Sequence, residues 1–204
     1  MGKWIISFVV AIVVIFFGFN FFSNVSAKNE RKARDKIFRA VYKFEEGKYE
    51  TALDGENEDE DGFEQVVRKY GVTSVGKLAH LYAATCWLQL YKVLFAREKC
   101  QNGIQHLEYL SFDNSKLLNE KKESLMGDLY VESGLFNDGG LAFISAAQKS
   151  IEKKFQPYYL FKASLAFPED RRTPQAISAL KEIIRNFPDH PYTEKARQRI
   201  ATLK

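Results

Sequence analysis

The side chains most able to do chemistry in this chain are two cysteines and three histidines: Cys86, Cys100, His80, His106 and His190. The cysteines match no metal-binding spacing, and the histidines are isolated from one another in the sequence. We expect the cysteines to be small buried apolar groups, with a disulfide between them as the alternative. No motif pairs a nucleophile with a base or sets two acids together, so the sequence predicts neither an enzyme nor a cofactor.

Residues 56–61 form an acidic run. We expect a solvated loop there; a calcium site is the lesser alternative, because the run lacks the spaced ligands, central glycine and distal glutamate of a calcium-binding loop. The formal net charge of +4 is spread along the chain, which is too weak to indicate nucleic-acid binding.

Three stretches of the chain repeat the same pattern. Small residues at Gly103, Gly139 and Ala176 are each followed, four and seven positions later, by a larger or apolar residue. Within each stretch, this spacing places the small residue and the two residues that follow it on one helix face. A period of about 35 residues between the stretches is typical of stacked helical hairpins. The sequence therefore predicts an all-α fold, a right-handed stack of about three hairpins plus capping helices. Local signals also predict helix ends and crossings: caps at Thr73 or Ser74 and at Thr173, first-turn prolines at Pro174 and Pro191, a terminating glycine at Gly134, and close helix approach at Gly127 and Gly139.

The first members of these hairpins align through Ala84, Gly127 and Ala163. The first interval is seven residues longer than the second, so we expect an elongated first hairpin of about two extra helical turns. Its protruding tip would carry Tyr91, Val93, Leu94 and Phe95. Apolar residues at such a tip need cover from the protein itself or from a partner.

Residues 4–22 form an uncharged apolar run. At about 1.5 Å per residue, this run is long enough to cross a bilayer. We interpret residues 1–27 as a retained signal anchor; a cleaved signal peptide ending near Ala27 is the alternative. Residues 28–77 then form a helical extension with the acidic loop, and residues 78–204 form the repeats and a charged C-terminal capping helix.

Basic residues after the apolar run alone would place the large domain in the cytoplasm. The same residues are predicted to begin a folded helix over 28–46, with Glu30 and Asp35 interleaved. Their charges therefore also have a structural explanation, and the orientation stays open at this point.

The small residues that open the helices, together with Pro188 after the last repeat, resemble the tetratricopeptide repeat. A narrower resemblance covers nearly the whole chain, through residues 42–55, 62–71 and 79–90 behind the apolar run. In these segments the chain resembles membrane-anchored repeat proteins of the bacterial envelope. Those proteins are similar to the ancillary subunit of the Sec translocon that works beside a periplasmic chaperone, especially the form found in Bacteroidetes-type bacteria. The long first hairpin and the short segment before the anchor depart from that pattern, which leaves the partner open.

This resemblance implies a single-pass inner-membrane protein with a periplasmic repeat domain that docks a chaperone, the translocon or client polypeptides. In such stacks the first helix of each hairpin lines a concave binding surface. The residues expected there are Leu78, Leu81, Thr85, Leu88, Gln89, Asp128, Val131, Leu160, Ser164 and Phe167. The alternative for each of them is that it packs against a neighbouring helix. The rival hypothesis is a signal-anchored receptor or assembly scaffold that faces the cytoplasm.

Overall fold

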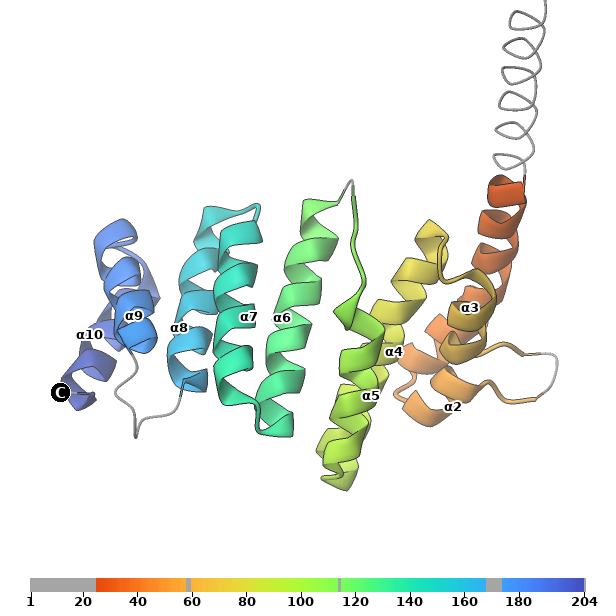
Figure 1. Ribbon diagram of the computed structural model, residues 1–204, viewed down its shortest axis with the longest axis horizontal. Coiled ribbons are helices and arrows are strands. Elements are labelled where there is room, and N and C mark those ends of the chain that lie inside the picture. Colours follow the sequence, from red (N-terminus) through yellow and green to blue (C-terminus); the bar gives the residue numbers. More distant parts are fainter. Residues whose placement is uncertain (1–24, 58–59, 114, 168–173, 204) are drawn as a thin grey trace, which may run out of the picture. The chain divides into compact units, whose positions relative to one another are not determined.

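The structure is a computed structural model that describes residues 25–57, 60–113, 115–167 and 174–203. Its described residues contain helices and no strand, and helices adjacent in the sequence pack against each other (Figure 1). The predicted all-α class is therefore confirmed. The chain divides into two compact units between Ala79 and His80, inside helix α4 (Ser74–Leu94) and close to the predicted boundary at residue 78.

The first unit begins with a helix over residues 25–45, which agrees with the helix predicted for 28–46. Two short helices follow, α2 (Tyr49–Asp54) and α3 (Phe63–Tyr70). Alanines and larger apolar side chains at helical spacing form the core of this unit. The buried members are Ala33, Ile37, Ala40, Ala52, Leu53, Phe63, Val66 and Ala79.

The described part of the acidic run is tied to neighbouring helices by ion pairs. Asp61 is 6% exposed and accepts a hydrogen bond from Lys69 at 2.7 Å. The other pairs are Lys43–Glu56, Arg39–Glu60 and Lys36–Asp61. These carboxylates hold lysine and arginine side chains of the first helix and of α3, so the loop is pinned to its own unit. The sequence predicts a solvated loop here, but at residues 60 and 61 the run packs on neighbouring helices, and Asp61 is buried.

Helix α4 starts with two caps. The Thr73 hydroxyl accepts the Gly76 amide at 3.0 Å, as the sequence predicts for this position. The Glu30 carboxylate accepts the amides of Ser74 and Val75. A carboxylate at a helix N-terminus also interacts favourably with the helix dipole.

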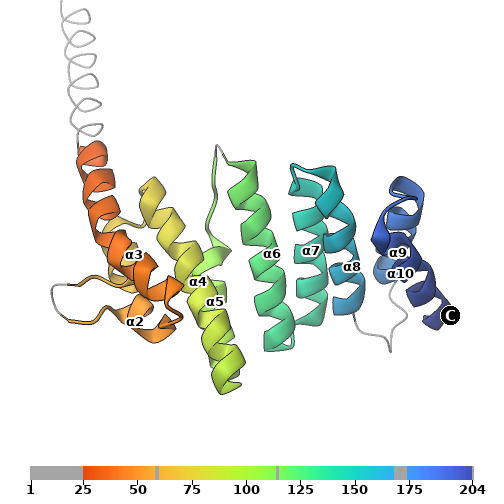
Figure 2. The same cartoon turned by 180° about the vertical axis from the view of Figure 1, so that it is seen from behind.

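The second unit is a row of helices that stand side by side in chain order (Figure 1), and the view from behind shows the same order (Figure 2). After α4 come α5 (Arg97–Glu108), α6 (Lys116–Ser133), α7 (Phe136–Lys149), the 3-10 helix η1 (Lys153–Phe155), α8 (Gln156–Ala166), α9 (Pro174–Asn186) and α10 (Pro191–Thr202).

Small residues set the close approach of these helices, as the repeat pattern predicts. A Cβ atom on Gly127 would lie 2.6 Å from the Phe143 ring, and one on Gly139 would lie 2.7 Å from the Val131 side chain. At Gly134 the backbone is left-handed, with φ of 88°, and its amide donates to Tyr130 and Val131. A glycine in this conformation ends α6 as predicted.

The C-terminal helices also begin where the sequence places them. Pro174 opens α9, while its predicted cap, Thr173, lies outside the described residues. Pro191 occupies the first turn of α10, and the His190 ring accepts the Tyr192 amide at 3.3 Å. The predicted charged final helix is thus confirmed as α10.

A buried carboxylate fastens the centre of the second unit. Glu120 of α6 is 4% exposed. It accepts hydrogen bonds from the Tyr159 hydroxyl at 2.9 Å and from the Ile151 amide at 3.1 Å. Because α6, the α7–α8 connection and α8 all meet at this one side chain, it links two successive hairpins.

The predicted membrane anchor, residues 4–22, lies outside the described residues. Among the helices that the structure does describe, none combines the length and the apolar character needed to cross a membrane.

Candidate docking surface at the hairpin turns

The tip of the α4–α5 hairpin exposes three consecutive apolar side chains. Val93, Leu94 and Phe95 are 68%, 51% and 79% exposed. Helix α4 has 21 residues, against 18 in α6 and 11 in α8, and its hairpin reaches beyond the turn between α6 and α7 (Figure 1). The predicted protruding tip is therefore present. The predicted two extra helical turns are not, because α5 has 12 residues against 14 in α7, so the first hairpin's helices are together only one residue longer than those of the second.

The backbone at this tip holds Phe95 in an unfavourable conformation. Phe95 has φ of 53°, the one left-handed non-glycine residue in the described chain. Its amide donates to the Tyr91 carbonyl, and the two rings contact edge to face. A left-handed residue with a Cβ costs roughly 1–2 kcal/mol. Apart from its contact with Tyr91 the Phe95 ring is exposed. A large exposed apolar side chain on strained backbone points to an external role.

The tip of the α4–α5 hairpin lies next to the turn between α6 and α7. The Tyr91 hydroxyl hydrogen-bonds to Glu132, and partial burial followed by this carboxylate raises the pKa of Tyr91. The Arg97 guanidinium lies 3.7 Å from the position that a Cβ on Gly134 would take. The first and second hairpin turns therefore lie close to each other.

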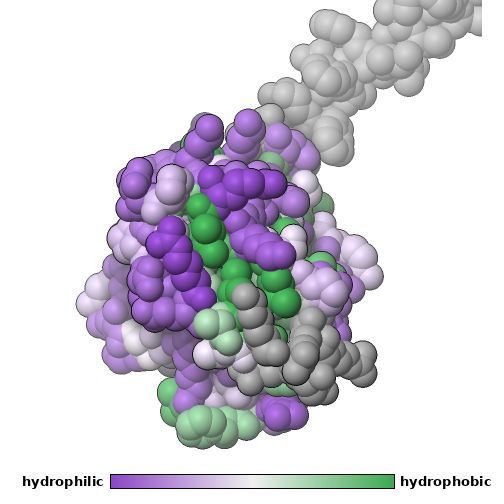
Figure 3. Space-filling view, turned by 90° about the vertical axis from the view of Figure 1, so that its left-hand side faces the viewer, coloured by the Kyte–Doolittle hydropathy of each residue, from purple (hydrophilic) through white to green (hydrophobic). Residues whose placement is uncertain are grey.

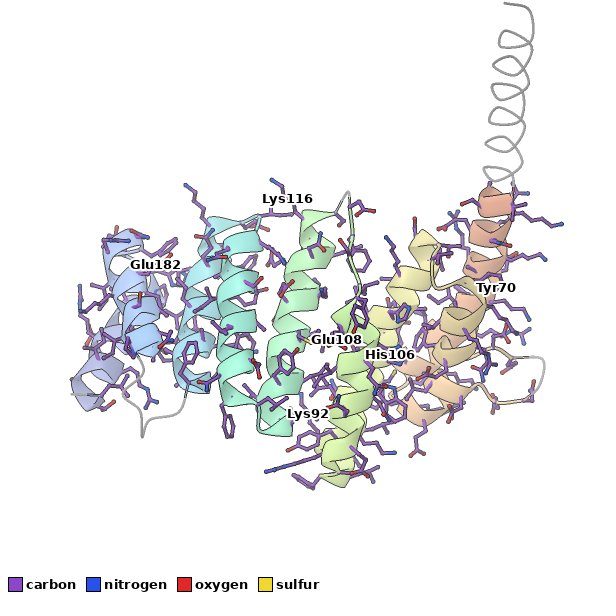
Figure 4. The ribbon with its side chains drawn as sticks, in the orientation of Figure 1. Tyr70, Lys92, His106, Glu108, Lys116 and Glu182 are labelled. Atoms are coloured by element: carbon purple, nitrogen blue, oxygen red, sulfur yellow. The ribbon has the colours of Figure 1, made fainter. Side chains whose placement is uncertain are left out.

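That second turn adds two more exposed apolar side chains, Leu135 at 44% and Phe136 at 46%. We call Val93, Leu94, Phe95, Leu135 and Phe136 together the turn-end patch. Charged side chains surround it, including exposed Lys92, which Figure 4 places at this end of the hairpin. An exposed apolar area with a polar rim is typical of a protein-binding surface.

Many of the residues expected on a concave binding surface are not exposed to solvent. Half of its residues are buried in the core: Leu81, Leu88, Leu160, Ser164 and Phe167. They pack between helices and so are unavailable to a partner. The Phe167 ring, for example, lies 2.5 Å from where a Cβ on Gly140 would be. Leu160 lines a groove of about 330 Å³ between α7, α8 and α9. Helices α7 and α9 are the second helices of their hairpins, so this groove is not the surface expected from first helices alone.

The remaining five residues of that expected surface are half-buried: Leu78, Thr85, Gln89, Asp128 and Val131. The Thr85 hydroxyl donates to the Leu81 carbonyl in its own helix. The Lys162 ammonium donates to Asp128 at 2.7 Å and lies over the Phe143 ring. Thr85 and Asp128 therefore already bind groups of the fold. For these five half-buried residues the docking face stays a prediction.

A second hollow lies along α9 at the end of the second unit. Figure 3 shows an apolar strip edged by hydrophilic side chains at this end. A groove of about 650 Å³ follows one side of α9, from Pro174 to Arg185, past Lys181 and Glu182. Charges of both signs line it, so it selects no partner chemistry.

Both cysteines are buried and neither forms a disulfide, which confirms their interpretation as small core residues. Burial raises the pKa of the Cys100 thiol to about 11, so the thiol is protonated at neutral pH and is a poor nucleophile. The described residues contain no group of three or more histidine, cysteine, aspartate or glutamate side chains that could hold a metal ion.

Two histidines that are remote in sequence are brought together. The Nδ1 atoms of His80 and His106 are 3.1 Å apart. Sequence reasoning missed this pair because it compared positions along the chain, whereas the pair spans two antiparallel helices. It also missed Leu135 and Phe136, although two large apolar residues directly after the helix-ending Gly134 are a signal of an exposed apolar turn.

No family model, no curated protein and no solved structure matches this chain. A functional conclusion therefore rests on the geometry of its surfaces and on the sequence pattern.

Proposed function

We propose that this protein is a non-enzymatic, membrane-anchored interaction scaffold of the tetratricopeptide-repeat type in the bacterial cell envelope. Its turn-end patch binds an apolar or amphipathic segment of a chaperone, of the Sec translocon or of a client polypeptide. The observation that carries the proposal is the run of three exposed apolar side chains at a hairpin tip, one of them on strained backbone.

The patch has the features that favour protein binding. It offers the aromatic rings of Phe95 and Phe136, and buried aromatic side chains supply much of the energy of protein interfaces. Because its turns are held by hydrogen bonds and by the contact of Arg97 with the Gly134 turn, little ordering is needed on binding. Such preorganisation raises affinity.

The uncharged run over residues 4–22 supports a bilayer anchor, and the resemblance to envelope repeat proteins supports a periplasmic repeat domain. The alternative is a cytoplasmic scaffold, and one observation favours it. Exposed basic residues follow the apolar run on the first helix: Lys28, Arg31, Lys32, Arg34 and Lys36. Lys36 faces Asp61 at 3.6 Å, so at least one of these charges also serves the fold.

The function is tested by changing Val93, Leu94 and Phe95 together to serine. The partner that is cross-linked to the wild-type chain in native membranes should be recovered at least about tenfold less with this variant, because losing three apolar contacts exceeds the 1.4 kcal/mol that a tenfold change in affinity represents. Recovery is measured by quantitative mass spectrometry after reversible cross-linking.

The matched control changes three exposed apolar residues at the other ends of the helices, Tyr109, Leu117 and Ile151, to serine. This control should retain the partner. Equal recovery from both variants and the wild type would refute the turn-end patch as the docking surface, and equal melting temperatures establish that neither variant is misfolded.

A further inference from the structure

The two histidines of the first hairpin are placed as a pair of metal ligands would be. His80 lies near the start of α4 and His106 near the end of α5, on the side of α5 next to α4 (Figure 4). Their Nδ1 atoms are 3.1 Å apart, and their ring planes are inclined by 62°. Both side chains are half-buried, so solvent reaches the site.

This separation suits one metal ion bound to both rings. With metal–nitrogen bonds of about 2.05 Å, two nitrogens 3.1 Å apart subtend an angle of about 98° at the ion. That angle lies between the values of about 90° for square-planar and about 109° for tetrahedral coordination. The pair can therefore bind an ion with a small adjustment of the rings.

We propose that His80 and His106 form a two-histidine site for a divalent transition-metal ion such as Zn²⁺, Ni²⁺ or Cu²⁺, with water completing the coordination sphere. Imidazole nitrogen is a preferred ligand of these ions. In the metal-free chain the two Nδ1 atoms share one hydrogen bond. On binding, the donor ring moves that proton to its Nε2 atom, so both Nδ1 lone pairs face the ion. No net charge is lost from the protein in this step.

The site lies at the open end of the first hairpin, opposite the tip. The two ligands are 26 positions apart in the chain and are brought together by the folded hairpin, so an ion that binds both favours the folded state over the unfolded one. Metal binding should therefore stabilise the α4–α5 hairpin that carries Val93, Leu94 and Phe95. The inference does not depend on the proposed docking function, since its ligands lie outside the patch.

The test uses the full-length chain in detergent, without a histidine tag. We expect Zn²⁺ at saturating concentration to raise the midpoint of thermal unfolding by at least about 3 °C. Substituting His80→Gln or His106→Gln should each weaken Zn²⁺ binding in calorimetry at least about tenfold, since losing even a hydrogen-bond partner of a ligand commonly costs that much. His190→Gln, which removes the third histidine, should bind as the wild type does.

Cu²⁺ supplies a readout that does not depend on any variant. Pulsed electron paramagnetic resonance of the wild-type chain with one equivalent of Cu²⁺ should show two coordinated imidazoles. Absence of imidazole coordination, or Zn²⁺ binding that persists when both His80 and His106 are glutamine, would overturn the proposal.

Discussion

Changing Phe167 to aspartate should unfold the second unit, or lower its melting temperature by roughly 10 °C or more. The Phe167 side chain is 3% exposed and packs on the backbone of α7 at Gly140. Truncating a buried phenylalanine costs about 3–5 kcal/mol, and an unpaired buried carboxylate adds to this cost. A domain with an unfolding free energy of about 5–15 kcal/mol cannot easily absorb such a loss.

The matched control is Leu165→Asp, two residues earlier in the chain. Leu165 is 52% exposed, so the same charge there should change stability by no more than about 0.5 kcal/mol. Circular dichroism during heating measures both variants. A Phe167→Asp chain that melts like the wild type would show that Phe167 is a surface residue after all, as the sequence suggested.

Changing Glu120 to alanine should destabilise the chain by about 2–4 kcal/mol. The substitution leaves the buried Tyr159 hydroxyl and the partly buried Ile151 amide without their acceptor, and an unsatisfied buried group costs about 1–3 kcal/mol. Urea unfolding of the wild type and the variant measures the difference. Glu152→Ala is the control, because Glu152 and its partner Lys154 are 56% and 65% exposed and exposed ion pairs contribute little.

A double-mutant cycle separates this hydrogen bond from packing. Glu120→Ala and Tyr159→Phe together should cost less than the sum of the two single changes, because Tyr159→Phe removes one of the orphaned donors. Burial, with the Glu120 hydrogen bond, raises the pKa of Tyr159. The hydroxyl thus stays protonated when folded, and its contribution is lost only as the pH rises above about 10, where the unfolded tyrosine ionises. Strict additivity would contradict the assigned contact.

The helices were predictable because their signals are local. Glycine at positions 127, 134 and 139, proline at 174 and 191, and the repeat offset define where helices begin, end and cross. The protruding first hairpin tip followed from the longer interval, but only some of the seven extra residues lengthen α4, while others lengthen the start of α6. The role of Glu120 was not predictable, since a glutamate in a charged helix has no local mark of burial.

The binding surface was only half predictable for a related reason. Periodicity identifies an apolar helix face but cannot tell whether that face meets a neighbouring helix or solvent. Phe167 and Leu160 fit the spacing of an inner face, yet the neighbouring helices cover them. Phe95 was correctly placed at a protruding tip because the chain-length argument, unlike periodicity, concerns where the backbone must leave the stack.

In-cell photo-cross-linking from the turn-end patch tests the central claim most directly. A photoreactive residue at position 94 or at position 136 should form adducts with the same envelope protein, whereas one at position 117, exposed at the other end of α6, should form none. Adducts only from position 117 would contradict the assignment of the docking surface. Adducts from positions 94 and 136 with cytoplasmic proteins alone would contradict the periplasmic orientation and support the cytoplasmic scaffold.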